Sequence, residues 1–352
     1  MSNKLRARRS TQRVTMNDVA KLADVSASTV SLYLRKPDEV STQLGKRIQS
    51  AIDTLGYVPN LMAGALAAAR TRVIGVVVPS MVNAIFASTV NTMQKTLGAQ
   101  GYQLLLGHSD YEESEEEAAV RTFLSWSPSA MVLTGLTHSR ETRRMLNNSN
   151  VPVVEMWELG SNPLDTLVGF SHHDVGYTQA RHLIEAGCQR IAFIGTRLSV
   201  DERAKQRCRG SEKAVRDLLG SQHARVIDCG FGRMAEAASR AFTDLITSHP
   251  NIDGIVFSND MLSLGALSEA QRRGIRVPDD IAMIGFGDMD FSDCTLPSLS
   301  TIRPPREEIG EAVAQSVLRR IKGLPQEKRI DIGFELLPRQ SSLRASILSH
   351  AP

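Results

Sequence analysis

The sequence predicts a small all-α N-terminal domain followed by a larger α/β core of two doubly wound parallel-sheet lobes. Residues 14–59 carry apolar side chains at helical spacing. From Arg72 onward, short apolar runs alternate with helical stretches, a pattern typical of parallel sheets. The alternation begins again near Phe170, so we expect two similar lobes with a cleft at the carboxyl ends of their strands.

Length and charge agree with a multidomain protein that has a basic N-terminal part. The chain has 352 residues and an ordinary composition, with 42% apolar and 22% charged residues. Its net charge is +3, yet residues 1–59 alone hold ten Lys or Arg against five Asp or Glu. A basic module on a nearly neutral body is typical of a phosphate-binding domain, and the alternative is a solubilising tail.

Cysteine usage and the N-terminus point to a soluble cytoplasmic protein. The four cysteines are scattered, which favours reduced thiols over a disulfide framework or a zinc site: Cys188, Cys208, Cys229 and Cys294. No apolar segment follows the basic N-terminus, and no apolar run approaches the ~18 residues that span a bilayer. We expect neither a metal ion nor a cofactor.

Residues 14–34 predict two short helices joined by a tight turn. Thr15 can cap the first helix in a capping box with Asp18, and Ser26 can cap the second. The apolar side of the first helix is predicted to comprise Val19, Ala20, Leu22 and Ala23. The second helix should direct these residues outward: Ala27, Ser28, Ser31 and Leu32. Such a pair can enter the DNA major groove, although any helical hairpin shares the pattern.

The flanking segments complete this predicted DNA-binding part. Residues 1–13 form a basic tail that we expect to be disordered. Ser41 caps a third helix whose apolar positions pack on the first two. Residues 60–71 are either a plain linker or a hinge helix that forms on DNA, with Leu66 as a wedge in the minor groove.

In the core, the pattern predicts alternating strands and helices. The predicted strands are 73–78, 102–106, 130–134, 151–155, 190–195, 225–228, 254–258 and 281–285. The predicted helices are 84–100, 114–126, 140–147, 175–186, 209–219, 234–248 and 261–273. The acidic run 112–117 is expected to be a solvated helix start.

Collinear motifs make the chain resemble the lactose-repressor/galactose-repressor family of bacterial transcription regulators. The motifs are T-M-N-D-V-A-K-L-A-D-V-S-A-S-T-V-S (15–31), G-Y-V-P-N (56–60), V-I-G-V-V-V-P (73–79), F-S-N-D-M-L-S-L-G-A-L (257–267), R-V-P-D-D-I-A-M-I-G-F (276–286) and L-S-T-I-R (299–303). The resemblance implies a helix-turn-helix headpiece and a periplasmic-binding-protein-like core. It also implies a homodimer that binds a near-palindromic operator and a small effector between the lobes.

The resemblance also suggests domain limits. These are a tail (1–13), a DNA-binding domain (14–59), a hinge (60–71), a two-lobed effector-binding and dimerisation domain (72–340) and a C-terminal tail (341–352). The first lobe would hold about 72–169 plus 303–329, and the second about 170–302 plus 330–340. The protein would act in the bacterial cytoplasm, on the nucleoid.

Shorter motifs resemble the gluconate-repressor branch. They are L-R-K-P-D-E-V-S (34–41), L-T-G-L-T-H (133–138), P-V-V-E (152–155), V-G-F (168–170) and D-E-R (201–203). The implied effector is gluconate or a related aldonate or ketoaldonate. The alternatives are a neutral sugar, a sugar phosphate or a nucleobase in the same family, or a solute-binding protein.

Two sets of site residues follow. The resemblance implies DNA contacts by Thr15, Ser26, Ala27, Ser28, Thr29, Ser31, Leu32, Asn60, Ala63 and Leu66. The predicted effector-binding residues are Ser80, Glu155, Phe170, Arg203, Lys205, Arg207, Asn259 and Asp288. Most family members carry Arg where this chain has Leu32, so its operator should differ. Arg207 falls on the family's ligand position, and a sugar-acid carboxylate requires such a cation.

Rival functions lack their sequence signatures. The junction after the first predicted core strand is P-S-M-V-N, without the G-x-G-x-x-G of a nicotinamide enzyme. The chain has neither a Walker motif nor a nucleophile elbow. A solute-binding protein of transport would carry a signal peptide and lack the helix pair. We therefore predict a transcriptional repressor and not an enzyme.

Overall fold

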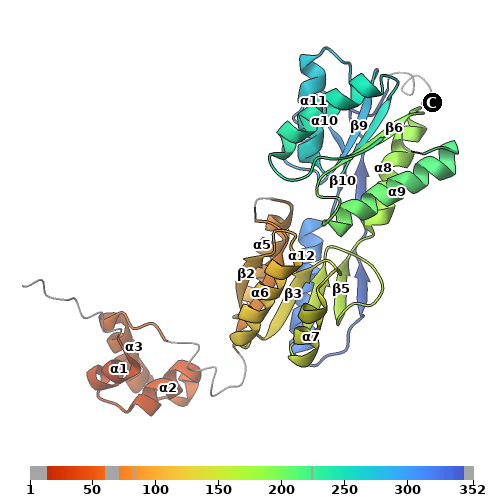
Figure 1. Ribbon diagram of the computed structural model, residues 1–352. Helices are drawn as coiled ribbons and strands as arrows, with labels where there is room; N and C mark the ends of the chain where they lie inside the picture. Colours follow the sequence, from red (N-terminus) through yellow and green to blue (C-terminus); the bar gives the residue numbers. More distant parts are fainter. Residues whose placement is uncertain (1–13, 60–70, 82–83, 223–224, 345–352) are drawn as a thin grey trace, which may run out of the picture. The chain divides into compact units, whose positions relative to one another are not determined.

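A computed structural model of the chain describes residues 14–59, 71–81, 84–222 and 225–344 (Figure 1). The chain divides into two compact units between Thr71 and Arg72. The first unit contains short helices, and the second contains both β-sheets.

The N-terminal unit is a bundle of three α-helices. These are α1 (Met16–Ala23), α2 (Ala27–Arg35) and α3 (Thr42–Leu55), with a 3₁₀ turn at Pro37–Glu39. The Asp18 carboxylate accepts hydrogen bonds from the backbone N–H and the hydroxyl of Thr15, at 2.8 and 2.7 Å. The Ser26 hydroxyl accepts from the Thr29 N–H at 3.1 Å. The caps predicted at Thr15 and Ser26 are confirmed, and each joins residues only three apart in the sequence. Ser41 is the N-cap residue of α3, but its side chain makes no capping hydrogen bond.

The core of this bundle differs from the sequence prediction at two positions. Leu22 is 52% exposed, whereas we expected it on the apolar side of α1. Ala27 packs partly against the core, although it was expected to point outward. The fully buried centre is formed by Val19, Val30 and Ile48, which come from all three helices.

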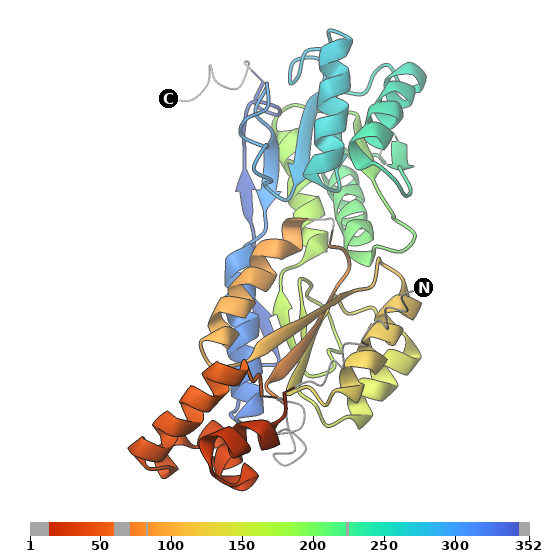
Figure 2. The same ribbon diagram turned by 90° about the vertical axis from the view of Figure 1, so that its left-hand side faces the viewer.

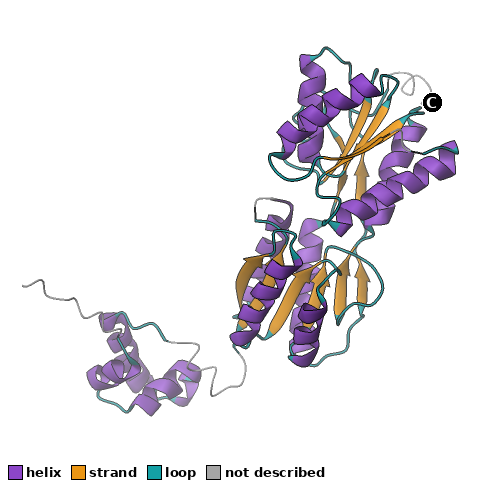
Figure 3. Cartoon of the chain, viewed as in Figure 1, coloured by secondary structure: helices purple, strands orange, loops and turns teal. Residues whose placement is uncertain are grey.

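The first core sheet has the strand order β11-β5-β4-β3-β1-β2. Its strands are β1 (Val73–Val78), β2 (Gln103–His108), β3 (Ala130–Thr134), β4 (Val153–Met156), β5 (Thr166–Gly169) and β11 (Arg329–Asp331). All its neighbouring strands are parallel. Parallel strands buried on both faces need helices on each side, and Figure 3 shows this arrangement.

Alternate residues of the first sheet face different helices. Val76, Val132 and Val154 belong to the core shared with α5 (Ala87–Gly98) and α12 (Arg306–Ile321). Val77, Met131 and Val153 face the opposite side, which is covered by α6 (Glu113–Ser125) and α7 (Arg140–Asn148). Helix α12 lies beside α5 although more than 200 residues separate them (Figure 2).

The second core sheet repeats this design, with the order β12-β10-β9-β8-β6-β7. Its strands are β6 (Ile191–Gly195), β7 (Arg225–Asp228), β8 (Gly254–Phe257), β9 (Ala282–Phe286), β10 (Ser300–Arg303) and β12 (Glu335–Leu337). Among the described strand pairs of the second sheet, β10 and β12 alone differ from the first sheet, because they run antiparallel. Helices α8 (His172–Glu185) and α9 (Glu202–Leu219) cover one face, and α10 (Met234–Ser248) and α11 (Asp260–Arg272) cover the other.

Most predicted core elements are confirmed within a few residues, and one helix boundary is wrong. The helix predicted for 209–219 begins at Glu202, because the Asp201 carboxylate caps it by accepting from the Arg203 N–H. The candidate residues at 203–207 therefore lie on a helix instead of a loop. The short strands β5, β10, β11 and β12 and the helix α12 had no counterpart among the predicted elements.

The lobe limits also need correction. Arg303 still belongs to β10 of the second sheet, and β11 continues in the first sheet to Asp331. The chain thus returns to the second lobe after Asp331 instead of at 330. The predicted C-terminal tail starts too early, because Ser341 and Ser342 are fully buried. Their hydroxyls bind the Met283 carbonyl and the Ser300 hydroxyl, respectively, which docks this segment on the second sheet.

No helix in the described part of the chain is long and apolar enough to cross a membrane. The same residues contain no cluster of three or more His, Cys, Asp or Glu side chains suited to hold a metal ion.

Candidate functional site

The predicted DNA-contacting residues of the headpiece lie at the start of α2 and along it. Ser26 and Ser28 are exposed, whereas Thr29, Ser31 and Leu32 are half-buried. The Ser26 hydroxyl bonds the hydroxyls of Ser28 and Thr29, both at 2.7 Å. A small polar cluster therefore marks the N-terminus of α2, where helix N–H groups favour a phosphate.

Other predicted DNA contacts have structural roles or lie outside the described residues. Thr15 is exposed but engaged in the capping box of α1. Ala27 contributes part of its surface to the headpiece core. Leu32 is not part of that core, so its side chain remains available for an apolar contact. Asn60, Ala63 and Leu66 lie outside the described residues, and their roles stay predictions.

A cavity of about 350 Å³ is lined by residues of both core lobes. Many of its walls follow the carboxyl ends of strands, where parallel α/β sheets place ligands. The first lobe contributes Ser80, Ile85, Phe86, Asp110, Tyr111 and Trp157. The second lobe contributes His172, Thr196, Arg197, Asp201, Arg203, Arg207, Gly232, Met234, Asn259, Asp260, Met261, Phe286 and Met289.

Arg207 is a buried cation in the wall of this cavity. It is 5% exposed, and one guanidinium nitrogen donates to Nδ1 of His172 at 2.7 Å. Its guanidinium carbon lies 4.3 Å from the centroid of the Phe286 ring. Its Nε has no hydrogen-bond partner among the residues that the structure describes. Burial lowers the pKa of Arg207 to about 10, so the side chain stays charged at neutral pH.

The neutral state of His172 makes the contact with Arg207 possible. Burial, followed by the charge of Arg207, lowers the pKa of His172 well below its usual value. Its Nε2 lies 2.8 Å from the Trp157 carbonyl and therefore donates to it, which leaves Nδ1 as an acceptor for Arg207. His172 thus bridges a first-lobe carbonyl to a second-lobe arginine.

Two glycines bring Arg207 to this place. A Cβ on Gly176 of α8 would lie 1.8 Å from the Arg207 carbonyl oxygen, and one on Gly210 would lie 1.8 Å from that of His173. The backbones of α8 and α9 therefore touch at these glycines. Glycines inside helices are a sequence signal for such close packing. The contact holds Arg207 beside His172 and fixes its direction.

Arg203 is a second cation of the cavity, one helical turn before Arg207. Its guanidinium lies 3.4 Å from the Asp201 carboxylate and donates to the Thr134 carbonyl at 3.4 Å. Burial opposes its charge, but Asp201 and other acidic neighbours raise the pKa of Arg203. Arg203 is therefore balanced by a carboxylate, whereas Arg207 forms no ion pair with the residues the structure describes.

Asn259 and Ser80 line the cavity, as predicted for effector-binding residues. The Asn259 side-chain oxygen accepts from the Leu262 N–H at 3.1 Å and caps α11. Its amide nitrogen makes only a weak 3.7 Å contact with the Met234 sulfur. One side chain thus caps a helix and also lines the cavity.

Glu155 does not line the cavity, contrary to the prediction. Glu155 lies two residues after Val153 in β4, so both side chains point to the face covered by α6 and α7. There its carboxylate lies 3.3 Å from Nε2 of His138, whose Nδ1 lies 2.7 Å from the Glu116 carboxylate. These side chains are almost fully buried. Glu116 is accordingly not part of a fully solvated acidic run.

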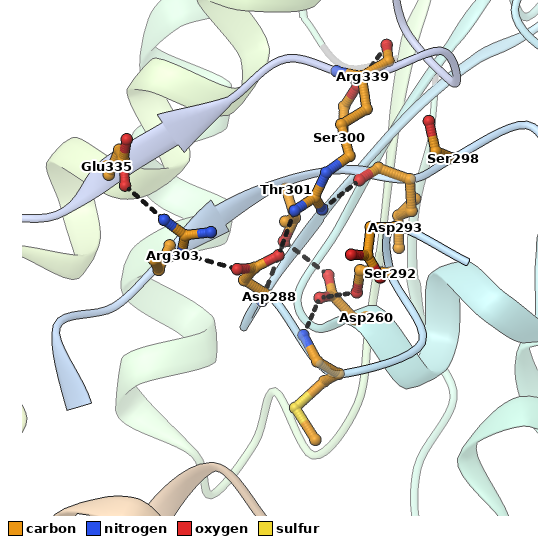
Figure 4. Close-up of polar contacts among 12 residues, drawn as sticks. Asp260, Asp288, Ser292, Asp293, Ser298, Ser300, Thr301, Arg303, Glu335 and Arg339 are labelled. Carbon is orange, nitrogen blue, oxygen red and sulfur yellow. Dashed lines mark hydrogen bonds and ion pairs between the residues drawn. The ribbon is translucent and has the colours of Figure 1, made fainter. Parts of the chain in front are cut away.

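Asp288 is also not a cavity residue. Figure 4 shows its carboxylate between Arg303 and Arg339, each at 2.7 Å. Arg303 also contacts Glu335, so the cluster joins the ends of β9, β10 and β12. Burial opposes the charge, yet the hydrogen bonds from Arg339 and Arg303 lower the pKa of Asp288. The sequence motif placed Asp288 at a strand end but could not show its distant arginines.

Phe170 and Lys205 are the other two predicted effector-binding residues that do not line the cavity. Phe170 is fully buried behind the cavity wall, where its ring packs on Trp157, His172 and Phe286. Lys205 is 41% exposed and pairs with Glu202 at 3.4 Å, because it lies on the outer side of α9.

Several cavity residues escaped the sequence prediction. Asp110 and Tyr111 follow β2, Trp157 follows β4, and Arg197 follows β6. Asp260 also lines the cavity, and its buried carboxylate accepts from Ser292 and Thr301, both at 2.8 Å (Figure 4). Their shared position directly after a strand was the signal that could have identified most of them. The cavity as a whole combines apolar rings and hydrogen-bond donors with Arg207, which has no ion-pair partner in the described part of the chain. This combination suits a small polyhydroxy anion.

A helical DNA-binding headpiece and a two-lobed core with a polar cavity define the class of ligand-controlled transcription regulators. Residues 15–60 match the family described as "Bacterial regulatory proteins, lacI family", and residues 180–342 match a "Periplasmic binding protein-like domain". The chain is 39% identical to the HTH-type transcriptional regulator GntR of Pseudomonas aeruginosa, covering 95% of this chain and 97% of that protein. It is 34% identical to the regulator GntR of Escherichia coli K12, covering 93% and 98%.

Solved structures agree with these relatives. A LacI-family regulator from Silicibacter pomeroyi superposes with a TM-score of 0.88 at 31% identity, covering 94% of this chain and all of that one. The regulator GntR from Chromobacterium violaceum gives 0.73 at 33% identity, covering 77% and 99%. The chain belongs to the LacI family of DNA-binding transcription regulators, and it is not an enzyme.

Proposed function

We propose that this regulator is a homodimeric repressor that releases near-palindromic operator DNA when a sugar acid binds in the cavity. The observation that carries the effector class is Arg207, a buried guanidinium without a carboxylate partner among the described residues. A buried cation is costly unless an anion pairs with it. A ligand carboxylate supplies that anion and matches the planar guanidinium.

The remaining lining supports a hydroxylated chain attached to the carboxylate. Asn259, Ser80 and Thr196 place polar groups around the cavity, while Phe86 and Trp157 provide an apolar wall. The resemblance to the gluconate-repressor branch favours gluconate or a ketogluconate among such acids. Effector binding would rotate the lobes and alter the hinge at 60–71, which lowers affinity for the operator.

The headpiece supports operator recognition by α2. Ser28 is exposed at its start, where recognition helices contact base edges. Leu32 offers an apolar surface for a thymine methyl in place of an arginine that would bind guanine. We further propose that the protein acts in the cytoplasm, on the nucleoid.

A ligand screen tests the effector class. Isothermal titration of the full chain with gluconate, ketogluconates, gluconate 6-phosphate and neutral sugars should show binding of the acids. Binding of neutral sugars or nucleobases alone would reject the sugar-acid proposal. A DNA mobility shift with and without the bound acid gives the direction of regulation, and stronger DNA binding with the acid would reject induction.

The Arg207→Ala variant tests the pocket assignment. Removing the partner of a buried ligand carboxylate should cost about 2–4 kcal/mol, or a roughly 30-fold to 1,000-fold loss of affinity for gluconate. Arg209→Ala is the matched control, since Arg209 lies on the same helix but is exposed and pairs with Glu202. Equal affinities of Arg207→Ala and the parent chain would overturn the assignment.

A further inference from the structure

One arginine of the cavity wall lies between two aromatic rings from different lobes. The guanidinium carbon of Arg197 is 4.8 Å from the centroid of the Tyr111 ring and 5.1 Å from that of Phe231. Tyr111 follows β2 of the first sheet, whereas Phe231 follows β7 of the second. Arg197 itself follows β6 of the second sheet. The cation–π stack therefore joins the two lobes.

An ion pair reinforces the same junction. A guanidinium nitrogen of Arg197 lies 4.0 Å from the carboxylate of Asp110, which belongs to the first lobe. Tyr111 also faces the guanidinium of Arg203, at 5.9 Å from its ring centroid. We call the group Asp110, Tyr111, Arg197 and Phe231 the clasp.

The clasp lies at the outer edge of the cavity. Exposure rises from 5% for Arg207 to 24% for the side chain of Arg197 and 61% for Phe231. Arg197 therefore lies between the buried end of the site and solvent.

The backbone of the clasp is strained on both sides of the cavity. Asp110, Tyr111 and Arg197 have φ values of +49°, +66° and +55°, a region that is unfavourable for residues with a Cβ. Such conformations persist where surrounding contacts compensate, and they concentrate at ligand clamps. Here they occur in the loop after β2 and in the loop after β6.

We propose that Arg197 is a positioning residue that closes the outer edge of the cavity by linking the lobes. The proposal rests on the proposed function for the identity of the ligand alone. The guanidinium of Arg197 already contacts two aromatic rings and a carboxylate, whereas that of Arg207 has no carboxylate partner among the described residues. Arg197 therefore slows effector escape by holding the lobes together and does not read the effector's charge.

Effector titrations of the full chain separate this role from direct anion binding. Arg197→Ala should weaken gluconate and the dianion glucarate by the same factor, roughly ten-fold, mainly through faster dissociation. Arg233→Ala is the matched control, because Arg233 is 91% exposed and follows Phe231 by two residues. A much larger loss for glucarate would overturn the clasp, because it would show that Arg197 binds a second anionic end.

A double-mutant cycle and hydrogen exchange test the link between lobes. Phe231→Ala should weaken gluconate similarly, and the double variant with Arg197→Ala should lose little more, since one stack is removed in each case. Without effector, Arg197→Ala should accelerate amide exchange in residues 108–112 of the opposite lobe, whereas Arg233→Ala should not. Unchanged exchange there would overturn the proposal. If the parent chain binds neither acid, the proposed function fails while the exchange result still decides the clasp.

Discussion

The two core lobes share one strand order, but their buried charged side chains differ in position. A buried cluster of the first lobe lies away from the cavity, whereas two buried arginines of the second lobe line it. In the first lobe, Glu116, His138 and Glu155 lie between the sheet and the helices α6 and α7. In the second lobe, Arg203 and Arg207 lie on the first turns of α9 and line the cavity. The same topology therefore supports a buried charge cluster away from the cavity in one lobe and cavity-lining arginines in the other.

The difference teaches that a charged residue at the end of a strand is not a site residue by itself. Strand residues alternate between faces, so Glu155 at the end of β4 points away from the cavity. Residues that follow a strand are free of this alternation, and Arg197 and Asn259 reach the cavity from such positions. Variants of each charge cluster test whether that cluster affects the free energy of unfolding, the affinity for the effector, or both.

The largest expected effect on stability comes from His138. Replacing it in His138→Leu leaves Glu116 and Glu155 as buried carboxylates without their cation, which should lower the free energy of unfolding by about 3–5 kcal/mol. Urea unfolding followed by tryptophan fluorescence reports this, because both tryptophans, Trp126 and Trp157, lie after Thr71.

Two further measurements complete the His138 experiment. Adding Glu116→Gln and Glu155→Gln to His138→Leu should recover part of the loss, because no uncompensated charge remains. Gluconate affinity of folded His138→Leu should stay within about two-fold of the parent chain. A stability loss below about 1 kcal/mol would show that the cluster is not a buried ion pair.

The same cluster predicts a pH dependence. Burial alone would lower the pKa of His138, but Glu116 and Glu155 raise it from 6.5 to about 9. A raised histidine pKa contributes stability that is complete below pH 6.5 and is lost as the pH rises through 9. At about 1.4 kcal/mol per pKa unit, the loss is up to about 3 kcal/mol. Unfolding curves at pH 6 and 9.5 measure this loss. An equal loss of unfolding free energy between these pH values in the triple variant would contradict the assignment to His138.

A smaller effect on stability is expected from replacing Asp288, which belongs to an ion-pair cluster of the second lobe outside the cavity. Asp288→Asn removes the charge that pairs with Arg303 and Arg339, which should cost about 1–2 kcal/mol of stability. Effector affinity should remain unchanged because Asp288 does not line the cavity. A loss of gluconate binding as large as that of Arg207→Ala, without a stability change, would reinstate Asp288 as an effector-binding residue.

Features set by neighbours in the sequence were predictable from the sequence alone. The caps at Thr15 and Ser26, the helix pair and the alternation of strands and helices depend on contacts within a few residues. Collinear motifs added the family, and with it Arg207 and Asn259 as cavity residues. The misplaced start of α9 came from missing the cap at Asp201, which is also a local signal.

Only the tertiary structure decided which charged groups meet. Glu155 and Glu116 both contact His138. Asp288 pairs with Arg303 and Arg339, and Arg197 stacks on Tyr111 across the cavity. Each pairing joins segments that are distant in the sequence, and it depends on strand order and side-chain direction. The sequence therefore determined that this protein has a headpiece and a two-lobed core, whereas packing decided which charged groups line the cavity and which pair with one another away from it.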